Sequence, residues 1–149
     1  MIAIGSVVGG RSEPIDDDWA GVQAVIRLDP EQFAADALAG LSDFSHLEVV
    51  FVFDRVDVAD VHLGARRPRG RADWPLVGIF AQRGKARPNR MGVSRCRLLG
   101  VDGLDVHVEG LDAIDGTPVL DVKPWMDEFA PRGRTRQPDW SRELMRDYY

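Results

Sequence analysis

The cations between Gly78 and Ser94 are the residues of this sequence that most clearly indicate a binding site. Apolar residues on both sides, at 77–80 and 93–98, predict strands, and the loop between them carries Arg83, Lys85, Arg87 and Arg90. A hairpin connection normally needs only about two to five residues, whereas a longer cationic loop presented by two strands is typical of a binding site. The alternative interpretation is a solvated loop whose arginines face water.

The distribution of charge supports a ligand of negative charge. The chain has 19 Lys and Arg against 24 Asp and Glu, a net charge of −5. From Arg66 to Arg97, ten cations and one acid, Asp73, give +9, and the remaining nine cations and 23 acids give −14. All of the ten except Lys85 are arginines, which suit bidentate phosphate contacts and stacking on bases. Such segregation favours an anionic ligand that meets one face of the protein.

Residues suited to covalent or metal chemistry are few. The single cysteine, Cys96, lies in a predicted strand and is expected to be a buried, inert thiol. The three histidines are widely separated, and no Cys or His pair has metal-ligand spacing, so we predict no metal site. Ser45 and His46 are adjacent, so on a strand their side chains would point to opposite faces and could not form a nucleophile–base pair. We expect His46 to be a hydrogen-bonded interior residue.

The sequence also lacks the common nucleotide-binding motifs. The glycines of the segment 5–10 neither match the spacing of the dinucleotide fingerprint nor precede a predicted helix. What remains is a site of turns, backbone amides, arginines and a few carboxylates. Such a site suits binding, or a transfer reaction in which the cosubstrate carries the reactivity and the protein supplies positioning.

Length and composition predict one domain that holds these residues. The chain has 149 residues, 44% of them hydrophobic, which is enough for a real core. No apolar run approaches the roughly 20 residues that a membrane span requires, and the first residues do not resemble a secretion signal. One cysteine fits a reducing cytoplasm. We therefore expect a cytoplasmic protein without membrane contact.

Hydrophobic periodicity predicts a mainly β barrel with short helices at its edges. Strands are expected at 2–8, 22–28, 48–53, 95–99, 104–109 and 119–123, with 48–53 central and buried on both faces. Asp29, Pro30 and Gln32 form a strong helix start, and that helix should end near Gly40. A mobile basic segment is expected at 64–72.

The C-terminal part is predicted to close the fold. Residues 1–137 should form the barrel domain, and residues 138–149 a helix packed on it or extending it. This amphipathic helix is expected over 139–147, with Trp140, Leu144 and Tyr148 docking. The acidic run Asp16–Asp18 reads as a solvated turn or as a loop that faces a ligand.

Four segments together resemble one known family. They are Phe44–Leu47, Gly78–Arg83, Arg87–Gly92 and Asp115–Pro124. In this order, over roughly residues 2–124, they look like the TsaA-like family, the family of the YaeB-type (TrmO) tRNA methyltransferases. The resemblance implies a β-barrel fold, S-adenosyl-L-methionine binding without a Rossmann fold, and a homodimer with the cofactor near the subunit interface. The family's characterised activity is methylation of the exocyclic nitrogen of threonylcarbamoyladenosine, next to the tRNA anticodon.

The resemblance also implies site residues. Those expected at the cofactor are Asp18, Trp19, Asp54, Arg55, Phe80, Arg83, Met91, Gly92, Val93, Ser94, Ala113, Ile114, Asp115 and Gly116. The basic residues expected at the nucleic acid, with one amide, are Arg66, Arg67, Arg69, Lys85, Arg87, Asn89 and Arg90. The chain departs from many members by having Arg90 for proline, Asp54 for histidine and an acidic loop for Pro-Arg-Gln, and the additional C-terminal domain of longer members is missing.

Two other functions remain open from the sequence alone. One is a non-catalytic barrel that binds RNA through the basic segment, and the other is a methyltransferase for a small acceptor. Asp115 likewise has two interpretations: a tight turn in which it bonds its own backbone, or a carboxylate that contacts the ligand. No general base can be assigned.

Overall fold

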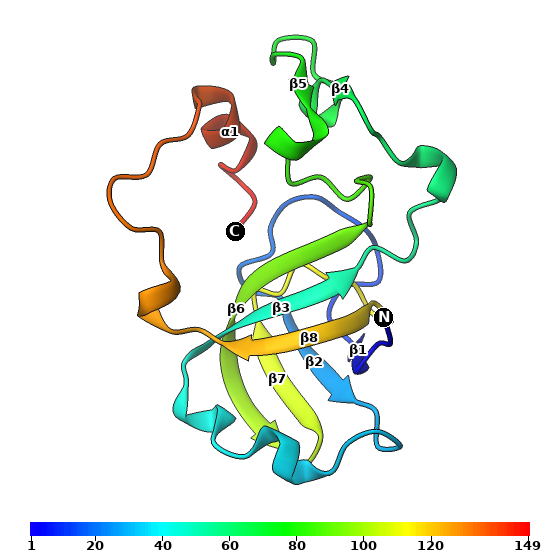
Figure 1. Cartoon of the computed structure of the whole chain (residues 1–149), viewed down its shortest axis with the longest axis vertical. Helices are drawn as coiled ribbons and strands as arrows, with labels where there is room; N and C mark the ends of the chain where they lie inside the picture. The colour runs from blue at the N-terminus through cyan, green and yellow to red at the C-terminus, as the bar shows by residue number, and fades with distance from the viewer.

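Six antiparallel strands form a closed barrel, in the order β1-β2-β7-β6-β3-β8, in the computed structural model, which describes residues 1–149 (Figure 1). The strands are β1 Gly5–Val8, β2 Gln23–Leu28, β3 His46–Val52, β6 Met91–Asp102, β7 Asp105–Glu109 and β8 Pro118–Pro124. Two shorter strands, β4 Ala65–Arg66 and β5 Val77–Gly78, pair with each other outside the barrel. The predicted mainly β barrel is confirmed.

Alternation of side chains explains why these segments close around one core. On β3, Leu47, Val49 and Phe51 point inward and are at most 1% exposed. On β6 the inward side chains are those of Ser94, Cys96 and Leu98, while the arginines between them face outward. A period of two puts every second residue on the same face of a strand. The prediction that the third strand is buried on both faces is wrong, because its outward residues are only half-buried.

The helix predicted from Asp29 to Gly40 does not form. The Asp29 carboxylate does accept hydrogen bonds from the Glu31 amide at 2.9 Å and from the Gln32 side chain at 2.7 Å. After this start the chain makes only short 3₁₀ turns, Ala35–Leu38 and Leu41–Asp43, with Gly40 at φ 81° between them. Neither turn contains a buried residue, and a short segment without a buried face gains little from a continuous helix.

The strands that flank the cationic loop are not partners of each other. β5 pairs with β4, and a 3₁₀ turn, Ile79–Ala81, follows it at once. β6 pairs with β3 and β7. It runs from Met91 to Asp102 and is therefore longer at both ends than the strand predicted there. The remaining 3₁₀ turns are Val58–Asp60, Pro68–Gly70 and Asp127–Phe129.

Three segments gather on one side of the barrel, and we call them together the cap. They are the loop 11–19, the lobe 64–87 that contains β4 and β5, and the tail 139–149 (Figure 1). The tail includes the single α-helix, α1 Asp139–Leu144, which ends three residues earlier than predicted. None of the helices has the length and apolar character that crossing a membrane requires.

Candidate functional site

The loop after β7 is tied to the first strand through Asp115. Its carboxylate accepts a hydrogen bond of 2.8 Å from the Gly9 amide, and its own amide donates to the Arg11 carbonyl at 2.7 Å. Asp115 therefore bonds the backbone of a distant loop, which differs from the interpretation of a tight turn in which it bonds its own backbone. Arg55 reaches the same place, because its guanidinium donates to the carbonyls of Ser12 at 3.0 Å and Asp115 at 3.2 Å.

The start of β6 brings together a second group of residues predicted at the cofactor. The Arg83 guanidinium donates to the Val93 carbonyl at 2.7 Å. The next side chain, Ser94, is 2% exposed, and its Oγ lies 3.4 Å from the Asp112 amide nitrogen that donates to it. Gly92 has a packing role, because a Cβ there would lie 2.4 Å from two ring carbons of Phe51.

The tail lies over this second group. The Tyr148 hydroxyl donates a hydrogen bond to Asp112 Oδ2, and the Tyr149 ring packs edge-to-face on that of Tyr148 with centroids 5.0 Å apart. The other oxygen of this carboxylate, Asp112 Oδ1, is buried and has no hydrogen-bond partner. Burial, and then the nearby Asp112 carboxylate, raise the pKa of the Tyr148 hydroxyl. The phenol thus stays protonated and donates.

Sequence reasoning placed Tyr148 only as a docking residue and did not single out Asp112 or Tyr149. The signal available in the sequence for Asp112 was its position directly before the predicted site residues Ala113–Gly116. Nothing in the local pattern shows that the tail returns to it.

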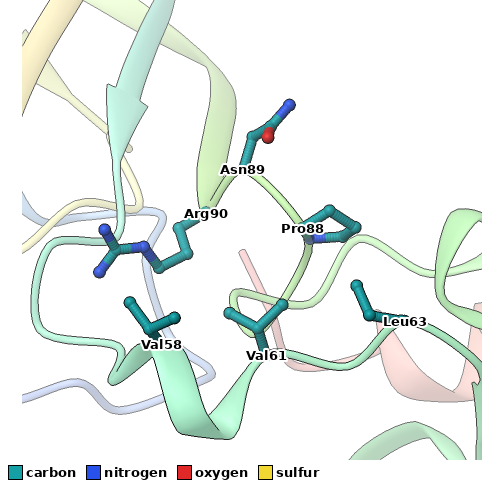
Figure 2. A pocket seen from close by; sticks show the side chains of 6 residues that line it. All are labelled: Val58, Val61, Leu63, Pro88, Asn89 and Arg90. Carbon is teal, nitrogen blue, oxygen red and sulfur yellow. The ribbon is translucent and has the colours of Figure 1, made fainter.

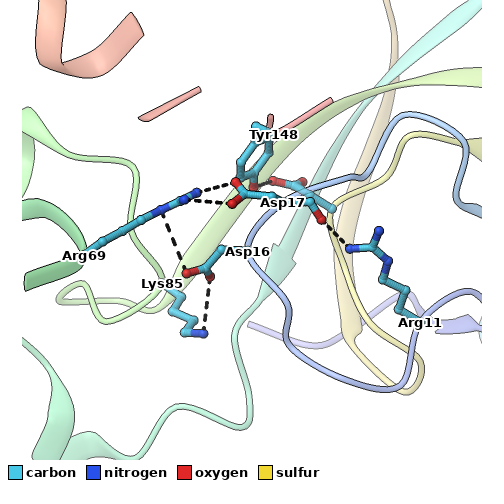
Figure 3. Close-up of polar contacts among 7 residues, drawn as sticks. Arg11, Asp16, Asp17, Arg69, Lys85 and Tyr148 are labelled. Carbon is cyan, nitrogen blue, oxygen red and sulfur yellow. Dashed lines mark hydrogen bonds and ion pairs between the residues drawn. The ribbon is translucent and has the colours of Figure 1, made fainter. Parts of the chain in front are cut away.

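The acidic run binds cations of the lobe, which neither sequence interpretation foresaw. Arg69 makes a two-point contact with the Asp17 carboxylate at 2.6 and 2.9 Å (Figure 3). Asp16 lies 3.8 Å from Lys85 Nζ and 4.0 Å from Arg69 Nε. The amides of Asp18 and Trp19 donate to the tail carbonyls of residues 147 and 148 at 2.8 and 2.9 Å. This loop therefore connects the lobe to the tail.

Most residues predicted at the nucleic acid have partners inside the chain. Besides Arg69 and Lys85, three arginines donate to backbone carbonyls: Arg67 to Trp74, Arg87 to Gln82 and Arg90 to Val56. Arg66 Nε is buried without a partner, and Asn89 is exposed. Fewer of these cations are therefore free to contact a nucleic acid than the formal charge of the segment suggests.

An open pocket of about 510 Å³ lies beside the lobe. Figure 2 shows its lining residues, which are Val58, Val61, Leu63, Pro88, Asn89 and Arg90. Only the last two belong to the predicted site. Among the remaining predicted residues, Trp19 is 4% exposed beneath the Arg11 guanidinium, whereas Phe80 is 79% exposed.

Two expectations about reactive side chains have opposite outcomes. Cys96 is buried as predicted, and burial together with Asp112 raises the pKa of its thiol to about 12. The predictions for Ser45 and His46 are wrong: Ser45 Oγ lies 2.8 Å from His46 Nδ1, and both residues are exposed. Ser45 precedes β3, so the alternation of a strand does not separate the two side chains. No group of three or more His, Cys, Asp or Glu residues is arranged to hold a metal ion.

The fold and the site define a class of protein: a small closed β-barrel whose polar candidate site is built on loops and a covering tail. Comparison with known proteins gives the family. The family described as the tRNA-methyltransferase O N-terminal domain matches residues 11–130, and the chain belongs to it. This confirms the resemblance drawn from the four motifs.

Individual relatives agree with this assignment. The chain is 40% identical over 98 residues to the tRNA (adenine(37)-N6)-methyltransferase of Escherichia coli, which is 62% of this chain and 40% of that protein. It is 34% identical over 120 residues to a probable S-adenosyl-L-methionine-binding protein of Methanothermobacter thermautotrophicus, which is 80% of this chain and 82% of that protein. A crystal structure of TrmO matches with a TM-score of 0.74 and 28% identity, over 91% of this chain and 61% of that one. The chain spans less than half the length of the methyltransferase relatives that it matches, between 21% and 45%.

Proposed function

We propose that this protein is an S-adenosyl-L-methionine-dependent methyltransferase that acts on the exocyclic nitrogen of the adenosine next to the anticodon of tRNA. The observation that carries the proposal is the family match over residues 11–130. The names of the relatives support it: one is a tRNA (adenine(37)-N6)-methyltransferase, and another is a probable S-adenosyl-L-methionine-binding protein. The resemblance adds threonylcarbamoyladenosine as the form of adenosine to test first.

The residues at the site fit the cofactor. Asp112 Oδ1 is a buried acceptor without a donor, and Arg83 offers further N–H groups beyond the one that bonds Val93. The cofactor, when bound, supplies an electrophilic methyl group on its sulfonium, so the protein needs no covalent nucleophile. The chain's own residues then have to bind and orient the reactants.

We assign these tasks to residues on the loops and strand ends. Arg83 and the strand start Met91–Ser94 would hold one side of the cofactor, and the loop Ala113–Gly116 with Asp54 and Arg55 the other. Asp18, Trp19 and Phe80 complete the proposed cofactor set. Of these residues, Asp115 and Arg55 meet in one hydrogen-bond group, and Arg83 and Ser94 meet at the start of β6.

Recognition of tRNA is proposed for the lobe and the loop that follows it. Phosphates would be met by Arg66, Arg67, Arg69, Lys85, Arg87 and Arg90, with Asn89 beside them. Counterion release makes such contacts salt-dependent. Because Arg69 and Lys85 already pair with Asp17 and Asp16, RNA phosphates would have to compete with these carboxylates.

Three further statements belong to the same proposal. The protein acts in the cytoplasm, and it forms a homodimer with the cofactor near the subunit interface. Residues 1–137 and 138–149 form one unit, which the hydrogen bonds between the tail and residues 18 and 19 support.

A methylation assay tests the function directly. Purified protein, S-adenosyl-L-methionine and tRNA that carries threonylcarbamoyladenosine should give the methylated nucleoside by mass spectrometry. The same measurement on tRNA from a deletion strain should show its loss. Arg83→Ala should weaken cofactor binding in calorimetry, whereas Arg136→Ala, on the exposed segment before α1, serves as the control.

The alternatives give different results in the same experiments. RNA affinity that is steeply salt-dependent, without cofactor binding at millimolar concentration, would show a non-catalytic RNA-binding barrel. Cofactor binding with unchanged tRNA modification in the deletion strain would show a methyltransferase for a small acceptor.

A further inference from the structure

The Lys and Arg side chains of this protein differ in whether they have a partner inside the chain. Of the 19, 14 precede residue 131, and 13 of these donate a hydrogen bond to, or form an ion pair with, another group of the protein. Arg66, whose Nε is buried without a partner, is the exception. The five that follow have no such partner and are all exposed: Arg132, Arg134, Arg136, Arg142 and Arg146. The unpaired positive charge is thus concentrated in residues 131–149.

Three of these arginines lie in residues 131–138, which we call the arginine segment. The segment links the 3₁₀ turn Asp127–Phe129 to α1 and lies outside the barrel (Figure 1). It has a proline at each end, contains no acid, and is exposed along its whole length. No backbone group of residues 131–137 takes part in a hydrogen bond. Its guanidinium and peptide groups are therefore available to a partner outside the chain.

The side chains of the segment indicate the kind of partner. Arginine binds phosphate groups through two parallel hydrogen bonds. Phe129, three residues before the first of these arginines, is 75% exposed, and an exposed aromatic ring beside a cationic track is what unpaired bases need for stacking. A membrane surface would require several apolar side chains beside the cations, and the segment has none except its prolines. These features favour RNA.

The segment is also held close to the candidate site. In the tail that follows it, Glu143 accepts a hydrogen bond of 2.8 Å from Trp74 Nε1 of the lobe, and the Tyr148 hydroxyl donates to Asp112. A strand of RNA on the arginine segment would therefore lie beside the cap.

We propose that the arginine segment, together with Arg142, Arg146 and Phe129, binds the RNA backbone and an unpaired base near the nucleotide that is methylated. The inference rests on the proposed function, because it takes tRNA as the substrate. It adds a contact surface outside residues 11–130, the part of the chain that matches the family. These arginines supply most of the electrostatic affinity, because the lobe cations Arg69 and Lys85 first have to leave their carboxylate partners.

Two variants of equal charge test this surface. One combines Arg132→Gln, Arg134→Gln and Arg136→Gln. The control combines Arg27→Gln, Arg97→Gln and Lys123→Gln, which removes the same charge from exposed side chains of barrel strands. The probe is the anticodon stem-loop of tRNA, and fluorescence anisotropy measures its Kd over a range of salt concentrations. Circular dichroism checks that each variant is folded.

The segment variant should bind the stem-loop about 10- to 100-fold more weakly than the wild-type protein in low salt. The slope of log affinity against log salt should fall by about 2, because each phosphate contact on a single strand contributes about 0.7. The control variant should keep the wild-type slope. Phe129→Ala should weaken binding by about 5-fold or more without changing the slope, because stacking releases no counterions. The affinity for S-adenosyl-L-methionine alone, measured by calorimetry, should stay the same in all variants.

Equal losses of affinity and slope in the two triple variants would overturn the inference, and methylation of the stem-loop by both would leave the proposed function standing. The inference would also fall if the segment variant kept its RNA affinity but lost binding to phosphatidylserine vesicles, since that would show a lipid partner. A wild-type protein that binds the cofactor but no RNA would overturn the inference together with the tRNA part of the proposed function.

Discussion

The barrel wall and the cap are held together by different means. The wall consists of paired strands around a core of 14 buried residues, so its shape depends on many equivalent contacts. The cap buries only a few apolar side chains, such as those of Trp19, Trp74 and Ile79, and individual polar contacts join its segments. Examples are the contacts of Arg69 with Asp17 and of Trp74 Nε1 with Glu143 at 2.8 Å. Each such contact is worth little by itself. The wall therefore sets the stability, and the cap sets the shape of the candidate site.

The largest loss of stability is expected from a substitution in the wall. Phe51 is 1% exposed and packs edge-to-face on Phe53 at 5.2 Å. Phe51→Ala should lower the free energy of unfolding by about 3–5 kcal/mol, because it removes buried surface and leaves a cavity. Denaturant titration followed by fluorescence measures this. A loss below about 1 kcal/mol would contradict the view that the wall carries the stability.

The pH dependence of stability gives a second test of the wall. The unfolded Cys96 thiol ionises near pH 9, whereas burial raises the pKa of the folded thiol to about 12. Between these values the folded state holds the proton and the unfolded state does not. The stability that this thiol contributes should therefore be fully present below pH 9. Above pH 9 the free energy of unfolding should fall by about 1.4 kcal/mol per pH unit.

Two variants test which side chain causes the loss of stability at alkaline pH. Cys96→Ala should flatten the slope between pH 9 and 12. Tyr148→Phe should reduce only a component that begins above pH 10, because burial raises the pKa of Tyr148 from its usual 10. An unchanged slope in the Cys96 variant would contradict a buried neutral thiol.

A single contact tests how the tail is held. Glu143→Ala leaves the indole N–H of Trp74, which is 3% exposed, without its acceptor. We expect a cost of about 1–2 kcal/mol, concentrated in the cap. Hydrogen exchange should show faster exchange of the Asp18 and Trp19 amides, which bond the tail. Arg142→Ala on the same helix is the control, and equal acceleration in both variants would argue against this contact.

The smallest effect concerns the exposed ion pairs. A double-mutant cycle with Arg69→Met and Asp17→Asn should give a coupling of about 0.5–1 kcal/mol that falls in 1 M salt. Arg27 and Asp105 form a similar two-point pair on the outside of the wall at 2.7 Å. Breaking the wall pair should leave exchange in the cap unchanged. Faster hydrogen exchange in the cap after that change would contradict the view that wall and cap are held independently.

The wall could be predicted from the sequence because its signals are local. Alternation marks the inward residues. The Asp102-Gly103 pair is a local hairpin signal, and it lies at the turn between β6 and β7, with Gly103 at φ 60°. The helix after Asp29 was overpredicted, because its capping residues form their bonds without a buried face to continue them.

The cap could not be predicted in the same way. β4 and β5 have two residues each, too few for a period to be recognised. The pairing of Asp17 with Arg69 spans 52 residues, and that of Asp112 with Tyr148 spans 36. Family resemblance indicated several site residues individually, but only the tertiary fold shows which of them meet.

The pairing of β1 with β8 has a consequence for synthesis on the ribosome. The first barrel strand bonds the last, with Gly5 opposite Val119 and Ser6 opposite Pro118. The barrel therefore cannot close until more than a hundred residues have been made, and long-range pairing of this kind is slow. Until then β3 lacks one of its two neighbours, and its apolar residues are exposed to other chains. The nascent protein is thus most in need of chaperones just before residues 118–124 leave the exit tunnel.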